Sequence, residues 1–206
     1  MLRGIAALIA AVGLSGCAQV TMSSMRAPEA RRYGSIMVFA PSADLSIRNA
    51  IEQGIVDGAA WYQLRVIKSE AVFFPGRVYP DSEVQQMPIG DSVEAVLVLA
   101  PTQEGATTAT LPTQSQAYCT YSTYQGCLSA SAITSTPTVT KPWGKYVAAL
   151  IDVRLNKTVW IATGTAEGSA FTDRSDLANA IAVKTLGKLA EDAVIEKGGH
   201  RPRPAP

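Results

Sequence analysis

The order of secondary-structure signals in the first half of the chain constrains its fold more than any other feature. Residues 35–40 form a continuous apolar run that ends at a proline, which is typical of a strand buried on both faces. Residues 42–44 offer a helix N-cap, and residues 45–60 carry isoleucine at every fourth position, which predicts an amphipathic helix. Residues 64–74 are rich in β-branched and aromatic side chains and stop at Pro-Gly. Strand, helix and strand in this order predict a βαβ unit.

The second half of the chain adds strands and one long helix. The predicted elements are a short helix within 79–87, strands at 93–100, 145–154 and 158–168, and a helix at 177–197. Residues 93–100 give the strongest strand signal and should lie centrally in the sheet, with Pro101 ending the strand. We therefore expect a single α/β (α+β) domain over residues 33–197, a small mixed β-sheet packed by two main helices.

Residues 102–142 interrupt this pattern with a Thr/Ser-rich excursion. Glu104 and Lys141 are its only charged side chains. An unstructured loop of this length is improbable inside a compact domain unless it is functional. We expect a loop or an irregular β-hairpin around residues 106–111 and 129–139.

Cys119 and Cys127 lie inside this excursion, with seven residues between them. An even pair of cysteines in an exported protein favours a disulfide, which would close a short loop. A metal site would need more ligands than the segment has, and His200, the only histidine, lies in a Pro-rich tail. We expect no metal and no cofactor.

Tyr118, Tyr121 and Tyr124 cluster beside the two cysteines. Tyrosines in a polar loop have the amphipathic character that contact surfaces use, so they are a candidate contact surface. Alternatively, they pack back onto the domain or cover the disulfide.

The N-terminus has the organisation of an export signal. A charged start at Arg3 precedes an apolar run over residues 5–14, which is too short to span a bilayer as a mature helix. The run ends at Leu14-Ser15-Gly16-Cys17, which resembles the lipobox of bacterial lipoproteins. That resemblance implies a signal peptide at residues 1–16, palmitate-type acylation of Cys17 and removal of the signal. The alternative is an ordinary signal peptide, with Cys17 as an incidental or disulfide-forming thiol.

Polar segments flank the expected domain at both ends. Residues 17–32 are polar and aperiodic and are interpreted as a lipidated tether, and residues 198–206 as a disordered tail. In lipoproteins an Asp after the acylated cysteine favours the inner membrane, so Ala18 here implies the outer membrane, with the domain facing the periplasm.

A strand containing Asp152-Val-Arg154, a turn with Asn156-Lys157, a strand beginning Val159-Trp160, and a long C-terminal helix carry a second resemblance. This pattern resembles periplasmic lipoproteins related to the curli-secretion lipoprotein, the penicillin-binding-protein activator lipoproteins and the TolB N-terminal domain. The resemblance covers mainly residues 145–196. It implies a small α/β sandwich that acts through protein contacts, without catalytic residues.

The composition argues against several functions. Eighteen basic residues balance 17 acidic ones, so the chain has no electrostatic footprint for nucleic acid. No Gly-x-Ser-x-Gly elbow accompanies the abundant serines, and the single histidine is remote. The sequence therefore predicts a non-enzymatic binding or assembly component of the envelope that contacts an envelope protein partner or itself. The alternatives are an oligomer-forming structural or secretion-associated lipoprotein, with residues 102–142 exchanging strands between copies, and a periplasmic enzyme.

Overall fold

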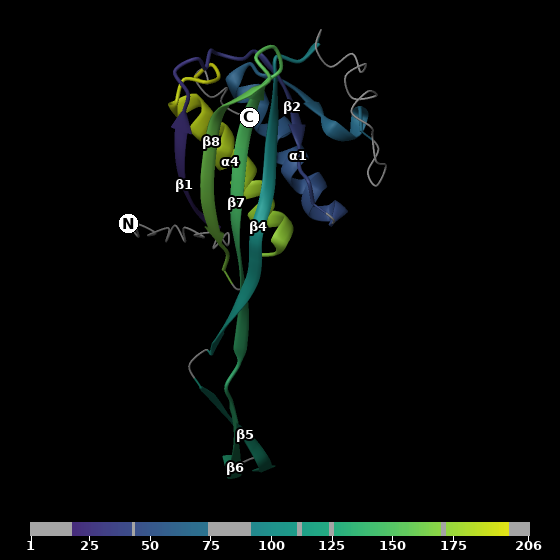
Figure 1. The fold of residues 1–206 in the computed structure, drawn as a ribbon. Helices are drawn as coiled ribbons and strands as arrows, with labels where there is room; N and C mark the ends of the chain where they lie inside the picture. Colours follow the sequence, from purple (N-terminus) through teal and green to yellow (C-terminus); the bar gives the residue numbers. More distant parts are fainter. Residues whose placement is uncertain are drawn as a thin grey trace, which may run out of the picture.

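The fold is a mixed β-sheet with helices on one face and a long β-ribbon projecting from one end (Figure 1). The computed structural model describes residues 18–42, 44–73, 92–110, 113–123, 126–169 and 172–197. The strands are β1 (Gln19–Arg26), β2 (Ser35–Phe39), β3 (Arg65–Lys68), β4 (Ala95–Thr110), β5 (Gln114–Thr123), β6 (Gly126–Ser135), β7 (Thr138–Asp152) and β8 (Lys157–Glu167). The helices are α1 (Leu45–Ala59) and α4 (Arg174–Glu191), with 3₁₀ turns at Ala60–Tyr62 and Ser69–Ala71.

The main sheet has the order β1-β8-β7-β4-β2-β3. β2 pairs in parallel with both β3 and β4, whereas β4, β7, β8 and β1 form antiparallel neighbours. This arrangement confirms the predicted α/β class, the βαβ unit formed by β2, α1 and β3, and the central position of β4. The predicted short helix at 79–87 lies outside the described residues.

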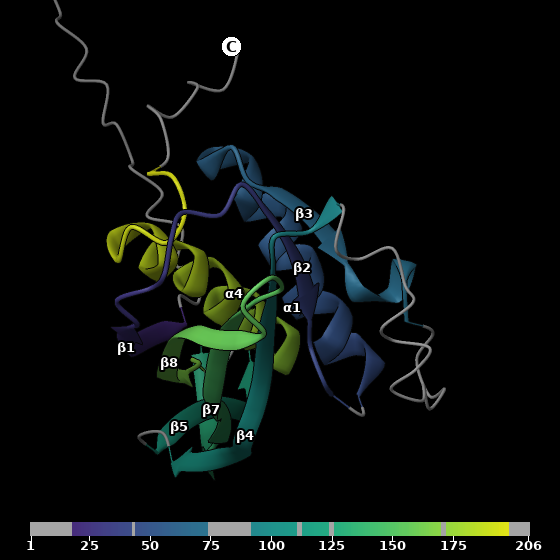
Figure 2. The same cartoon turned by 45° about the horizontal axis from the view of Figure 1, so that its top comes forward.

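Helices α1 and α4 pack side by side on the same face of the sheet (Figures 1 and 2). Asp44 caps α1 by accepting from the amides of Ser46 and Ile47, and Asp173 forms a capping box with Asp176 at the start of α4. The fully buried side chains of both helices meet alternate residues of the central strands, which form the core. The largest of these side chains are Ile47, Ile51, Ile55, Leu97, Leu99, Leu150, Leu177, Ile181 and Leu186.

The expected tether at residues 17–32 is wrong over most of its length. Gln19–Arg26 is strand β1, paired with β8 in unbroken register from Gln19 opposite Glu167 to Arg26 opposite Trp160. The reason is an alternation in which Val20 and Met22 pack against the core while their neighbours face outward. The first described strand therefore begins two residues after Cys17.

Two predicted strand ends also need correction. β4 does not end at Pro101 but continues to Thr110, with a register shift between Pro101 and Gln103. A proline is tolerated at such an irregularity because a regular ladder position is already lost there. The strand predicted at 64–74 is shorter, because β3 gives way to a 3₁₀ turn at Ser69.

The last helix ends at Glu191, six residues before the predicted end. Ala193 adopts a left-handed conformation with φ of 56°, and its amide and that of Val194 donate to the carbonyls of Ala190 and Leu189. This is a Schellman end. The turn brings Val194 and Ile195 into the core, both at most 1% exposed, so burial of two apolar side chains ends the helix early. The expected stop at residues 198–199 and the tail lie outside the described residues.

The excursion at residues 102–142 is a β-hairpin, more regular than predicted. β4 and β7 stay paired beyond the end of β8, from Ala106 opposite Pro142 to Thr110 opposite Thr138. β5 and β6 then form a second antiparallel pair at the tip (Figure 1). We call residues 104–142 the ribbon.

Candidate interaction surfaces

The structure places the sequence-predicted site residues in two regions. Cys17 and Tyr124 lie outside the described residues. Tyr118 and Tyr121 lie on β5 near the tip of the ribbon, as does Cys119, and Cys127 lies on β6. The backbone register sets Cys119 opposite Ala130 and Cys127 opposite Ser122, so the cysteines are not direct cross-strand partners there. Their disulfide stays a prediction.

The start of the folded domain and the base of the ribbon lie at the same end of the sheet. Gln19 pairs with Glu167, and Glu167 pairs with Trp143 of β7. Trp143 in turn pairs with Gly105, and β4 and β7 extend beyond β8 and β1 from the next pair, Ala106 opposite Pro142. The start of β1 therefore lies beside the base of the ribbon, as the course of β1 in Figure 1 shows.

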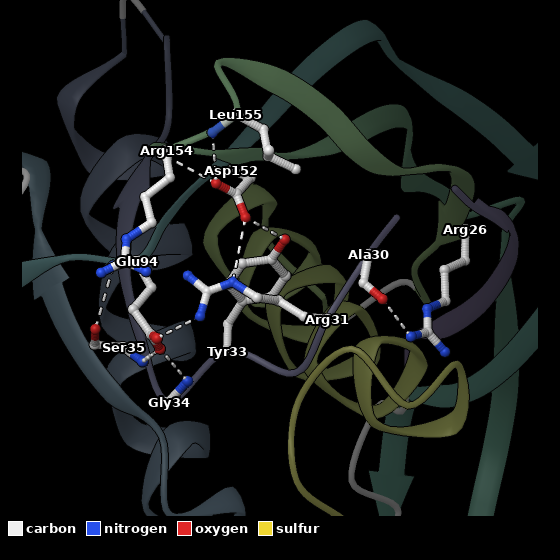
Figure 3. A network of polar contacts seen from close by, with 10 residues as sticks. All are labelled: Arg26, Ala30, Arg31, Tyr33, Gly34, Ser35, Glu94, Asp152, Arg154 and Leu155. Atoms are coloured by element: carbon white, nitrogen blue, oxygen red, sulfur yellow. Dashed lines mark hydrogen bonds and ion pairs between the residues drawn. The ribbon is translucent and has the colours of Figure 1, made fainter. Parts of the chain in front are cut away.

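The opposite end of the sheet is held by a polar network around Asp152 (Figure 3). Asp152 is 1% exposed, and its Oδ1 accepts from the amides of Arg154 and Leu155 at 2.8 and 2.9 Å. Its Oδ2 accepts from the Tyr33 hydroxyl at 2.8 Å and from Arg31 Nε at 3.4 Å. These contacts fix the turn between β7 and β8 and join it to the segment after β1.

Burial alone would raise the pKa of Asp152. The donors from Leu155, Tyr33, Arg154 and Arg31 outweigh burial, so the pKa of Asp152 is lowered. Burial, reinforced by the hydrogen bond to Asp152, raises the pKa of Tyr33 to about 12. The pair is therefore a stable carboxylate with a protonated phenol, which suits a structural role.

Glu94 extends this network. Its carboxylate accepts from the Gly34 amide at 2.6 Å, from the Ser35 amide at 3.2 Å and from Arg31 at 2.9 Å. The Arg31 guanidinium also lies 5.0 Å from the centre of the Tyr33 ring. Arg31, Glu94 and Asp152, shown in Figure 3, thus hold this end of the sheet together.

A second cluster fastens β1 to the end of α4. Asp192 Oδ2 accepts from Trp160 Nε1 at 2.7 Å and from Ser24 Oγ at 2.5 Å, and Lys188 lies 3.5 Å from Oδ1. Arg26 also donates to the Asp192 carbonyl oxygen at 3.2 Å. Burial opposes the charge of Asp192, but the Ser24 and Trp160 donors and Lys188 lower its pKa. β1 is therefore an integral strand.

A third cluster is buried where β2 and β3 end. Glu52 is 1% exposed and accepts from Ser69 Oγ at 2.6 Å, Arg48 Nε at 3.3 Å and the Ala40 amide at 3.4 Å. Arg48 also donates to Ser69 and lies 5.7 Å from the Phe39 ring centre. This closed set joins α1 to both strands.

The described residues hold no arrangement that points to catalysis. No group of three or more His, Cys, Asp or Glu side chains among them could hold a metal ion. No helix in the described part of the chain is long and apolar enough to cross a membrane.

The face of the sheet opposite the helices carries side chains that no described helix covers (Figure 1). A shallow hollow of about 430 Å³ lies over β1, β8 and β7, and its lining includes four threonines and Lys145 on β7. A second hollow of about 300 Å³ lies beside Met25 and Ile161, which are cross-strand neighbours with exposed fractions of 76% and 43%. Within the described residues, no helix covers this face of the sheet or the ribbon.

Sequence reasoning missed the β1 strand, the clusters around Asp152 and Asp192, and the uncovered sheet face. The alternation in residues 19–25 was a usable signal for β1 and, with it, for one side of the uncovered face. The partners of Asp152 are about 120 positions away in the chain, at Tyr33 and Arg31. No local pattern connects them.

The sequence matches no protein-family model and no curated protein. Among solved structures, the chain is similar to the PelC dodecamer from Paraburkholderia phytofirmans, with 18% identity over 83% of this chain and 97% of that chain, and a TM-score of 0.46. It is also similar to lipoprotein GNA1162 from Neisseria meningitidis, with 16% identity over 77% and 99% of the two chains and a TM-score of 0.41. At these levels the likeness carries no argument about function, so the proposals below rest on the residues of this chain.

Proposed function

We propose that this chain is a lipoprotein anchored in the outer membrane through acylated Cys17, with its domain facing the periplasm. It acts without catalysis, as a binding or assembly component of the envelope. The observation that carries the proposal is the short distance between the lipobox-like motif and the fold. Only Ala18 separates Cys17 from β1, a span of roughly 7 Å. Acylation there would hold the domain directly against the bilayer.

The position of the ribbon supports a binding role near the membrane. Its base lies at the anchored end of the sheet, beside Gln19 and Glu167. Over residues 104–142 it carries only the charges of Glu104 and Lys141, so there is little electrostatic cost to covering it. Tyr118, Tyr121 and Tyr124 near the tip are proposed as the contact residues, and Cys119 with Cys127 as the disulfide that stabilises the tip.

Mass spectrometry of the mature protein tests the anchor. The N-terminal peptide should begin at Cys17 and carry acyl chains, and Cys17→Ser should abolish both processing and acylation. Cys119→Ser is the matched control, because it removes a thiol without touching the motif. A mature chain that begins at Met1 with an unmodified Cys17 would contradict the proposal, and density-gradient separation of the two membranes tests the outer-membrane location.

A shortened ribbon tests the binding role. Thr107 and Lys141 are cross-strand partners, so Asn-Gly in place of residues 108–140 gives a two-residue hairpin and leaves the sheet intact. After crosslinking, the full chain should capture specific envelope proteins. The chain with the shortened ribbon should no longer capture them. If the same partners remain bound, the ribbon is not the contact surface.

An oligomer-forming lipoprotein is the second candidate, favoured by the free edges of the ribbon. A two-stranded ribbon is only marginally stable in water, and exposed strand edges readily pair with other strands. Sedimentation of the detergent-solubilised protein distinguishes the candidates, because copies joined through the ribbon should separate when the ribbon is shortened.

A further inference from the structure

The free edge of β1 is the surface that this inference concerns. β1 ends the main sheet, and within the described residues no strand lies on its outer side. Its eight residues contain no proline, no lysine and no register shift, and their only charge is Arg26 at the end. Proline, lysine and irregular register are the features that ordinarily protect a strand edge, and β1 lacks all three. The other edge strand, β3, has only four residues, and a charged residue lies at each end of it, Arg65 and Lys68.

The hydrogen-bond alternation tells which groups of β1 are available. The Ala27 amide donates to the Val159 carbonyl oxygen, so the odd-numbered residues of β1 direct their backbone groups at β8. On the other side of β8, the Gly168 amide donates to the Pro142 carbonyl oxygen, which agrees with this alternation because the even-numbered residues there face β7. The backbone groups that point away from the sheet therefore belong to Val20, Met22, Ser24 and Arg26.

This row of groups is complementary to itself. When two β1 strands run antiparallel with Ser23 on a two-fold axis, Val20 lies opposite Arg26 and Met22 opposite Ser24. All of these are outward-pointing residues, so the pairing forms about eight hydrogen bonds. On the uncovered face, Thr21 lies opposite Met25 and Ser23 opposite its own copy. No like charges face each other, and Met25, 76% exposed in the single chain, gains a neighbour.

We propose that β1 pairs with β1 of a second copy of this chain, in the register centred on Ser23. The interface is isologous, and it joins two sheets into one continuous sheet with both helix layers on the same side. The pairing itself depends on the strand edge and not on the lipid.

A cysteine placed on the proposed axis tests the register. Paired residues of the kind that exchange no backbone hydrogen bonds have Cα atoms about 4.5 Å apart, within disulfide range, so Ser23→Cys should crosslink two copies. Thr163→Cys is the matched control, because Thr163 lies on the same face opposite Ser23 but one strand further from the axis. Its two copies would be roughly 14 Å apart and out of range.

The full chain is expressed, its membranes are treated with a mild oxidant, and dimers are measured on a non-reducing gel. Ser23→Cys should give at least about tenfold more dimer than Thr163→Cys. Equal crosslinking in the two variants would overturn the proposal. Repeating the measurement on the detergent-purified chain tests the β1 pairing separately from the proposed anchor. If Ser23→Cys forms the dimer in a chain whose Cys17 is not acylated, the pairing stands and the anchor is wrong.

Charge substitution supplies an independent test. Ser23 is exposed, so Ser23→Lys or Ser23→Glu leaves the fold intact but sets like charges opposite each other across the axis. Each variant alone should lose copurification of two differently tagged copies, and coexpression of the Lys and Glu variants should restore it. Copurification that is unaffected by either variant, or that the mixed pair fails to restore, would contradict pairing at this edge.

Discussion

Tyr33→Phe removes one hydroxyl from the core and tests the network around Asp152. Tyr33 is 1% exposed, and its hydroxyl donates to Asp152 Oδ2 at 2.8 Å. The phenylalanine ring fills the same space and keeps its position beneath the Arg31 guanidinium. The substitution therefore isolates the hydrogen bond from packing.

The expected cost follows from the charge of the acceptor. A hydrogen bond to a charged group contributes about 1.5 to 3 kcal/mol. Asp152 keeps the amides of Arg154 and Leu155 and the Arg31 guanidinium, so the loss should lie near the lower end. We expect Tyr33→Phe to lower the free energy of unfolding by about 2 kcal/mol, which corresponds to a melting temperature roughly 4 to 8 °C lower for a domain of this size.

The lowered pKa of Asp152 also predicts how the destabilisation by Tyr33→Phe changes with pH. The pKa of Asp152 is lowered in the folded state, so the stability it contributes is complete above its unfolded value, near 4, and is lost as the pH falls through the folded value. Tyr33, with a pKa of about 12, stays a donor throughout this range. The difference between Tyr33→Phe and the unchanged protein should therefore be constant from pH 5 to 8 and shrink below about pH 4.

Urea unfolding followed by circular dichroism measures these differences in a double-mutant cycle with Asp152→Asn. Without the carboxylate, Tyr33→Phe should cost less than about 1 kcal/mol. If it costs the same amount in both backgrounds, the hydroxyl does not act through Asp152 and the reasoning is refuted.

Three further changes test other parts of the fold by the same unfolding assay or by hydrogen exchange. Ala193→Gly should raise the unfolding free energy by about 0.5 to 1 kcal/mol, because glycine adopts the left-handed φ of 56° without strain; an unchanged or lower value would argue against this helix end. Gly54→Ala should destabilise, since its Cβ would overlap the Asn179 side-chain oxygen across the helix contact, whereas Gly187→Ala, whose Cβ would meet the Tyr62 hydroxyl at an ordinary contact distance of 3.8 Å, should gain about 1 kcal/mol from helix propensity; equal effects would refute the close approach. Asp192→Asn should speed amide exchange in β1 more than in β7, and uniform exchange would show that the cluster does not hold β1.

The elements that could be predicted from the sequence are those whose buried apolar residues form a local pattern, either periodic or continuous. The isoleucines of α1 repeat every four residues, and β2 and the first part of β4 are continuous apolar runs, so each was predicted in place. β1 was missed because only Val20 and Met22 mark its buried face, among serines and threonines that are equally typical of a linker. The early end of α4 depends on Val194 and Ile195 finding the core, which is decided by tertiary contacts.

The sequence predicted a hairpin within residues 102–142, but it placed the end of β4 wrongly at Pro101, for a related reason. Proline was interpreted as a strand end at Pro101, but a strand accepts proline where its missing N–H has no partner to lose. Pro142 shows the same effect, since it lies beside the end of β8 and only its carbonyl oxygen is used, by Gly168. Whether a proline interrupts a strand thus depends on the neighbouring strand, which is distant in sequence.

The position of β1 also determines how the domain would carry load from a lipid at Cys17. A pull on that cysteine acts along β1 from Gln19, parallel to the strand and perpendicular to the hydrogen bonds that join it to β8. All of these bonds are then loaded together, instead of one after another as in peeling. The Asp192 cluster fastens the far end of the strand through Ser24 and Arg26, so β1 cannot slide without breaking it as well. A strand in this place would therefore pass such a load directly into the sheet and the end of α4, which a flexible tether would not do.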